Sequence, residues 1–144
     1  SQDGWVVANF IFDPLIYVKT AFEDLLPMDS LEEEVGTITV QRLARSEAWA
    51  AYHATIERKT DDALIVKLAP LKEVVCSPVI HPVNRGFNSI IEATVHATRF
   101  QKSRDPWLHE LIRHHASLVR RCGGPRELEA LDLLSTYLDL GSED

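Results

Sequence analysis

Three ionisable side chains interrupt an otherwise apolar helical pattern at residues 84–100, NRGFNSIIEATVHATRF. Glu92, His96 and Arg99 follow one another at spacings of four and three, which places them on one face of the expected helix. Such a face could bind a ligand, bond to other helices, or remain a solvated stripe with pairs worth about 0.2–0.5 kcal/mol each. The spacing alone favours the solvated stripe, with His96 at the surface.

A second ionisable cluster, HELIRHH at 109–115, has only a superficial likeness to a zinc-protease helix. That motif needs two histidines four residues apart, so that both reach one metal. Here Arg113 occupies that position, and His114 lies five residues after His109, which turns the two imidazoles apart. We therefore interpret His114 and Glu110 as an ordinary i,i+4 pair and predict no metal site.

No other motif in the chain identifies a catalytic residue. A glycine-rich phosphate-binding loop and a serine nucleophile elbow are both absent from the sequence. Cys76 and Cys122 have neither CxxC nor metal-ligand spacing, and we expect two free, buried thiols, as is typical of a reducing compartment. Since no apolar run is long enough for a membrane helix and no signal-peptide pattern opens the chain, we predict a cytoplasmic protein without membrane contact.

The composition fits one compact domain, or one domain with a small appendage. The chain has 144 residues, of which 45% are hydrophobic and 26% are charged. Its net charge of −7 argues against nucleic-acid binding, because phosphate backbones favour clustered positive charge. Between residues 99 and 126, however, two acidic residues, Asp105 and Glu110, face seven basic ones: Arg99, Lys102, Arg104, Arg113, Arg120, Arg121 and Arg126. This basic segment is either a partner surface or, as we favour, a solvated helix face.

The first half of the chain is mainly strand-like, with apolar or alternating runs bounded by turn residues. The expected strands lie at 5–12, 37–43, 48–58 and 63–78. One helix interrupts them: Asp13 and Pro14 form its start, and Pro27 ends it. The acidic stretch 28–36, MDSLEEEVG, is interpreted as a solvated loop.

After residue 82 the apolar period changes to that of a helix. Three helices are expected, at 84–101, from Asp105-Pro106 to Arg121, and from Pro125 onward. Strands first and helices last predict an α+β fold with an antiparallel sheet. We expect a β-rich part with one inserted helix at 1–82 and a C-terminal three-helix subdomain at 83–144.

Three stretches of the chain together resemble the domain-of-unknown-function 447 family: NFIFDPLIYVKTAF at 9–22, NRGFNSIIEATVHATR at 84–99 and GGPRELEA at 123–130. The positions that match the family pattern are Asn9, Asp13-Pro14, Asn84-Arg85, Glu92, Thr98-Arg99, Gly123-Gly124 and Glu127. Gly86 stands where the pattern has alanine, a small change that we expect to matter little. The resemblance covers most of the chain and implies an FMN-binding split β-barrel followed by a helical C-terminal part.

The resemblance also implies a flavin site. Asn84 and Arg85 open a helix, where backbone N–H groups and a guanidinium favour an anion such as the FMN phosphate. With Asn9, these are the residues that we expect to bind FMN, while Glu92 and Arg99 are expected to hold the helices against the barrel. Flavins in such folds generally lie between subunits, so we expect a homodimer that transfers electrons or hydride through the flavin.

Two other functions remain open from the sequence. A non-catalytic binding module could dock an acidic partner on its basic C-terminal helices, and a pterin or folate could replace FMN. The family pattern also places barrel strands before Asn9, and this chain enters its first strand after four residues. We therefore expect that residues belonging upstream are missing from it.

Overall fold

The computed structural model describes residues 3–24 and 26–140 of the chain. The described residues form two compact units. The strand unit comprises residues 3–12 and 26–80, and the helical unit comprises residues 13–24 and 81–140.

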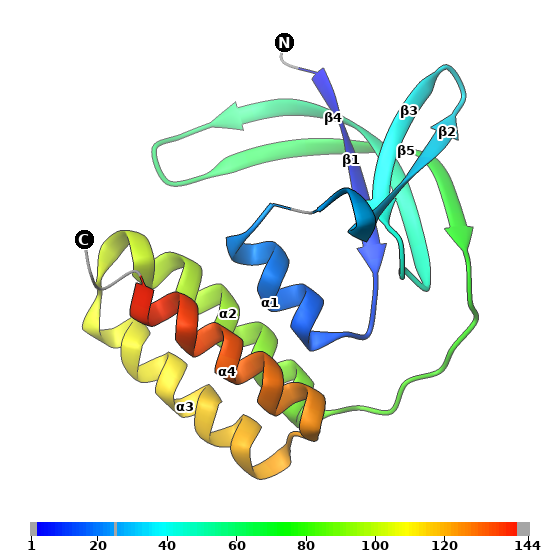
Figure 1. Cartoon of the computed structure of the whole chain (residues 1–144). Helices are drawn as coiled ribbons and strands as arrows, with labels where there is room; N and C mark the ends of the chain where they lie inside the picture. The colour runs from blue at the N-terminus through cyan, green and yellow to red at the C-terminus, as the bar shows by residue number, and fades with distance from the viewer. Residues whose placement is uncertain (1–2, 25, 141–144) are drawn as a thin grey trace. The chain divides into compact units, whose positions relative to one another are not determined.

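The strand unit contains a three-stranded sheet and a two-stranded hairpin, and every pairing in them is antiparallel. The strands are β1 (Asp3–Phe10), β2 (Ser30–Val35), β3 (Ile38–Leu43), β4 (Ala48–Lys59) and β5 (Leu64–Val75), with a 3-10 turn η1 (Pro27–Asp29) before β2. The sheet order is β1-β4-β5, and β2 pairs with β3 (Figure 1). The helices lie in the other unit, so the α+β fold with antiparallel sheets is confirmed.

The acidic stretch 28–36 is largely a strand, so the prediction of a solvated loop was wrong. Residues 30–35 form β2, and Gly36 makes the turn into β3 with a φ of +61°, which glycine adopts without strain. The charge in this strand is compensated locally, because Glu33 accepts a hydrogen bond from Arg42 Nε on β3 at 2.7 Å. Val35 at the end of β2 is buried in the core, which gives the acidic strand an apolar anchor.

The core of the strand unit forms around Trp49, whose side chain is only 2% exposed. Val35, Val40 and Ala51 complete the buried cluster, and partly buried aliphatic residues pack against it. Arg42 and Lys72 each approach the face of the Trp49 ring, at 6.0 and 5.7 Å from its centroid. Both distances are within the range of cation–π contacts.

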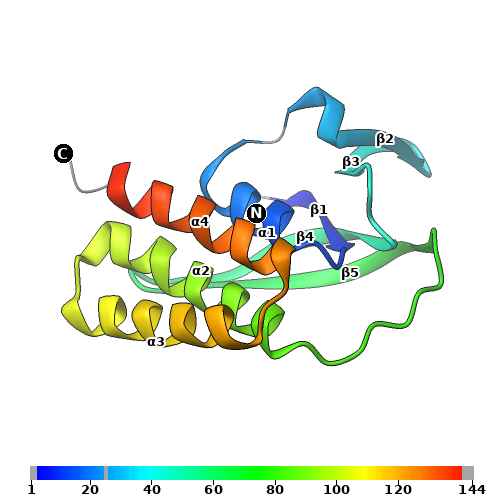
Figure 2. The same cartoon turned by 60° about the horizontal axis from the view of Figure 1, so that its bottom comes forward.

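The helical unit contains α1 (Pro14–Phe22), α2 (Arg85–Ser103), α3 (Pro106–Cys122) and α4 (Pro125–Leu140). Figures 1 and 2 both show α2 and α3 running side by side. The helix starts are those expected from the sequence: the side chains of Asp13, Asn84 and Asp105 each accept a backbone N–H of the first turn. The three C-terminal helices are therefore confirmed.

Helix α1 belongs to the helical unit by its packing. Val18 of α1 is fully buried in the same core as Ile90 of α2 and Leu134 of α4. The rings of Phe22 and Tyr137 stack with centroids 4.8 Å apart. Burial and the hydrogen bond that the Tyr137 hydroxyl donates to Glu23 raise the pKa of Tyr137 to about 12. The helical unit thus contains four helices. The expected division into 1–82 and 83–144 placed α1 in the β-rich part, whereas in the structure α1 belongs to the helical unit.

Candidate functional site

Asn84 joins the start of α2 to the start of α4. Its Oδ1 accepts the backbone N–H of Phe87 at 3.0 Å, and its Nδ2 donates to Glu127 Oε1 at 3.1 Å. The other oxygen of Glu127 accepts the backbone N–H of Gly124 at 2.8 Å, and Glu127 is only 7% exposed. A buried carboxylate needs such partners, so both side chains have a structural role at this junction.

Arg85 lies beside this junction and is exposed. Its guanidinium forms no hydrogen bond or ion pair with any residue that the structure describes, so it is available to an incoming anion. The neighbouring Glu127 carboxylate weakens the anion preference of this helix start, because like charges repel. Arg85 is therefore the main attraction for an anion here.

Asn9 holds strand β1 to the segment between β3 and β4. Its Oδ1 accepts the backbone N–H of Leu43 at 2.8 Å and the hydroxyl of the buried Ser46 at 2.9 Å. Its amide nitrogen makes only a long contact, 3.5 Å from the carbonyl oxygen of Val7. The assignment of Asn9, Asn84 and Arg85 to a flavin site stays a prediction, since Asn9 lies in the strand unit and the other two in the helical unit.

The strand unit has a hollow of about 270 Å³ that is lined in part by Trp49 and Glu73. Phe10, Tyr52 and Val74 also line it, so it offers aromatic and aliphatic surface. Its volume lies just below the range of about 300–1,000 Å³ that is typical of small-molecule sites.

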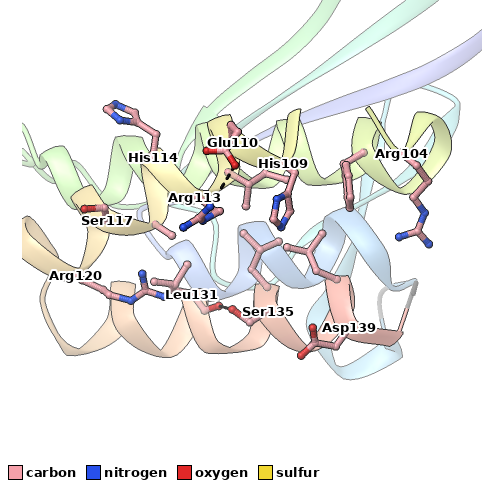
Figure 3. Close-up of a pocket in the computed structure, with 15 residues that line it drawn as sticks. Arg104, His109, Glu110, Arg113, His114, Ser117, Arg120, Leu131, Ser135 and Asp139 are labelled. Atoms are coloured by element: carbon pink, nitrogen blue, oxygen red, sulfur yellow. Dashed lines mark hydrogen bonds and ion pairs between the residues drawn. The ribbon is translucent and has the colours of Figure 1, made fainter. Parts of the chain in front are cut away.

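A larger groove of about 700 Å³ lies in the helical unit between α3 and α4. Its apolar side chains come from the core, among them Ile112, Leu131 and Leu138. Figure 3 shows His109, Arg113 and Arg120 extending from α3 toward α4. The volume is that of a typical ligand site, and the combination of apolar walls with cations suits an amphipathic anion.

The basic segment predicted from the sequence contributes three arginines to this groove, Arg104, Arg113 and Arg120. Arg113 donates to Glu110 at 3.2 Å, so the predicted pair of Glu110 with His114 is replaced by an i,i+3 ion pair. Glu110 and Asp139 are the two carboxylates in the lining. Both cysteines are free, as expected, but they are exposed rather than buried.

His96 differs most from its predicted surface position. It is half-buried, and its ring stacks on His115 of α3 with centroids 5.6 Å apart and planes 28° apart. Burial lowers the pKa of His115, the nearby His96 and His114 lower it further, and Glu92 opposes them. His115 could not be predicted as a partner of His96 from the sequence, because the spacing pattern of one helix contains no information on contacts with another helix.

Comparison with known families decides which family this chain belongs to. Residues 1–77 match the model of the N-terminal domain of a protein of unknown function (DUF447), and residues 84–136 match the model of a second DUF447 domain. The chain belongs to the DUF447 family. The resemblance noted in the sequence is therefore confirmed, while no curated protein matches the chain.

A solved DUF447 structure is similar to this chain over most of its length. It is the crystal structure of the FMN-bound protein MM1853 from Methanosarcina mazei, with 36% sequence identity and a TM-score of 0.83. The similarity covers 92% of this DUF447 chain and 70% of the MM1853 chain. Within the described residues, no helix of this chain is both long enough and apolar enough to cross a membrane.

Proposed function

We propose that this DUF447 chain binds FMN. The FMN-bound relative carries the proposal, because 36% identity over 92% of this chain relates the two proteins by sequence as well as by fold. Fold alone would be weaker support, since one fold can host many functions.

The donor groups of the predicted site are compatible with FMN. An amide nitrogen has two N–H donors, and Asn84 uses one of them on Glu127. Asn9 makes only its long contact to Val7, so its amide nitrogen also retains donor capacity. Together with the available guanidinium of Arg85, these groups could donate to the carbonyl and phosphate oxygens of FMN.

We further propose that the chain is an oxidoreductase. When bound, FMN supplies the chemistry of hydride or electron transfer, as flavins do generally, and the protein supplies binding, orientation and electrostatics. In this proposal Arg85 holds the phosphate, and the two asparagine amides orient the cofactor. No residue of the chain is assigned as a protein acid or base.

The test of FMN binding is a fluorescence titration with FMN and, in parallel, with riboflavin, which lacks the phosphate. The wild-type chain should bind FMN more tightly than riboflavin. Arg85→Ala should weaken FMN binding about tenfold or more, as the loss of a charge-assisted contact predicts, and should leave riboflavin binding almost unchanged. Arg99→Ala is the matched control, because Arg99 is exposed on the same helix and away from its start.

The arms of this titration separate the claims. A wild-type chain that binds neither flavin contradicts the FMN proposal. Binding that is insensitive to Arg85→Ala contradicts only the role of Arg85. For a chain that binds FMN, anaerobic addition of NADH or NADPH should bleach the flavin absorbance, and an unchanged spectrum with both would argue against hydride transfer from nicotinamides.

We also propose a split barrel completed in a homodimer. In the strand unit, β5 pairs only with β4 among the described strands, which leaves its other edge unpaired. The strand exposes five large apolar side chains: Leu64, Ile65, Leu68, Leu71 and Val75. A long apolar edge strand is prone to pair with another chain, so we propose that a second copy of this chain packs against β5.

Light scattering coupled to size-exclusion chromatography tests the dimer. The wild-type chain should have twice the mass of its sequence, and Leu68→Lys should shift it to the monomer. Arg58→Lys, on the exposed end of β4, is a conservative control and should stay dimeric. A monomeric wild-type chain at all concentrations would contradict the proposal.

The groove between α3 and α4 favours a second candidate function, the docking of an acidic amphipathic helix of a partner protein. Its apolar walls would accept the apolar face of that helix, and Arg104, Arg113 and Arg120 would pair with its carboxylates. A labelled peptide with leucine on one face and glutamate on the other is a suitable probe.

Charge reversal distinguishes this docking function from flavin binding. Replacing Arg104, Arg113 and Arg120 by glutamate should abolish peptide binding without changing the flavin content. Arg99→Glu, outside the groove lining, is the control and should bind the peptide normally. If the wild-type chain does not bind the peptide, or the reversed variant binds it equally well, the docking hypothesis is wrong.

A further inference from the structure

Two helices bring a carboxylate and two imidazoles together away from the groove. Glu92 and His96 lie one turn apart on α2, and His115 lies on the adjacent helix α3. One ligand atom from each of the three side chains lies within 4.8 Å of the others. The geometry points to a binding site for a divalent transition-metal ion, with Glu92, His96 and His115 as its protein ligands.

The histidines also have unused ligand capacity. Nδ1 of His96 and Nδ1 of His115 are both buried and have no hydrogen-bond partner among the described residues. A buried polar atom without a partner is costly, so two of them on a pair of stacked rings require an explanation. A metal ion bound by the imidazoles would explain them, because it would orient both rings and give each ring a polar partner.

The three ligand types indicate the class of ion. Two imidazoles and a carboxylate suit Zn²⁺ and, equally, Fe²⁺, Co²⁺ or Ni²⁺, whereas Mg²⁺ and Ca²⁺ prefer oxygen ligands alone. Around a tetrahedral Zn²⁺ the ligand atoms lie about 3.3 Å apart, since each is about 2.0–2.1 Å from the metal. Small side-chain rotations would therefore bring the ligand atoms from within 4.8 Å of one another to the shorter spacing that the ion requires. The exposed Glu92 can make such a rotation most easily.

Three protein ligands leave a coordination position open. Structural zinc sites usually have four protein ligands, whereas three ligands leave room for water or a small molecule. Glu92 is exposed, so solvent reaches the Glu92 side of the cluster. The site would also link α2 to α3, so metal binding should stabilise the helical unit.

Cobalt titration of the untagged, full-length chain tests the site. Co²⁺ should produce visible d–d absorbance with a stoichiometry of one per chain, and Zn²⁺ should displace it. His96→Gln and His115→Gln should each weaken binding about tenfold or more. His114→Gln is the matched control. The His114 ring packs edge-on against the His115 ring with centroids 5.4 Å apart, but His114 is not one of the three ligands.

A variant on the surface keeps the test decisive if a histidine variant fails to fold. Glu92→Gln changes an exposed side chain, so this variant should fold normally. It should nevertheless bind Co²⁺ at least tenfold more weakly than the wild type does. Thermal unfolding with and without Zn²⁺ gives a second measurement, in which metal should stabilise the wild type and His114→Gln more than any of the three ligand variants. Absence of Co²⁺ binding by the wild type, or equal effects of His114→Gln and His115→Gln, would overturn the inference.

Discussion

Gly86 near the start of α2 packs directly against Gly123 at the end of α3. A Cβ on Gly86 would lie 2.5 Å from the Gly123 Cα and 2.7 Å from its backbone nitrogen, much closer than real contacts allow. The expectation that glycine in place of alanine matters little here was therefore wrong. In this chain the absence of a side chain lets two helix ends meet.

Gly86→Ala should consequently destabilise the helical unit. Overpacking of this kind typically costs about 1–3 kcal/mol, because backbone rather than a flexible side chain must move. Urea unfolding followed by circular dichroism measures the change. Gly4→Ala is the control, since a Cβ there would meet nothing within 4 Å; equal stability of the two variants would contradict the close contact.

The ion pair between Asp13 and Arg126 should contribute to the stability of the helical unit. Asp13 caps α1. Its Oδ1 accepts a hydrogen bond from Arg126 Nε at 3.1 Å, and its Oδ2 accepts one from Arg126 Nη2 at 2.9 Å. Asp13→Asn retains the capping ability but loses the charge, so we expect a loss of about 1 kcal/mol at pH 7, as for partly exposed pairs. Chemical unfolding of both chains measures it.

The effect of Asp13→Asn should depend on pH. Burial would raise the pKa of Asp13, but hydrogen bonds from Arg126 and the Leu15 backbone outweigh it and hold the pKa below the ordinary 3.8. A carboxyl with a lowered folded-state pKa stabilises the fold above its unfolded-state pKa and loses that contribution as the pH falls through the folded value. The difference between the two chains should therefore be full at neutral pH and disappear below pH 3.8. A difference that grows on acidification would contradict this assignment.

The junction of Asn84 with Glu127 makes a prediction about charge at a buried contact. Asn84→Asp preserves the helix cap but places a second carboxylate against the buried Glu127. Because like charges repel and the Glu127 oxygen loses its donor, the variant should lose about 1–3 kcal/mol of stability at pH 7. Thermal unfolding at pH 7 tests it. Asn88→Asp, exposed on the same helix, is the control, and an equal loss in the two variants would contradict the contact.

Asn9 should have a measurable structural role whatever it binds. Asn9→Ala removes the acceptor of the Leu43 N–H and of the buried Ser46 hydroxyl, at a cost of about 1–3 kcal/mol. Asn9→Asp keeps that acceptor and should retain most of the stability. If Asn9→Ala unfolds at the same urea concentration as the wild type, these two hydrogen bonds do not support the strand unit.

Local signals in the sequence predicted most elements of this fold. Asp13-Pro14, Asn84 and Asp105-Pro106 marked helix starts correctly, because capping depends only on neighbouring residues. The DUF447 resemblance added the family, which composition and periodicity could not have supplied.

Features that depend on distant partners were not predicted. The acidic strand β2 became possible because Arg42 on β3 neutralises Glu33 and Val35 reaches the core. The packing of Val18 with Leu134 and the pairing of His96 with His115 likewise join segments far apart in sequence. Periodicity within one segment contains no information on such contacts.

The absorbance spectrum of the purified chain is the decisive measurement of FMN binding. The protein is expressed without added flavin, purified, and denatured so that mass spectrometry can identify any released small molecule. We expect flavin absorbance bands and release of FMN, or uptake of added FMN with a shifted spectrum. A colourless chain that also fails to take up FMN would contradict it.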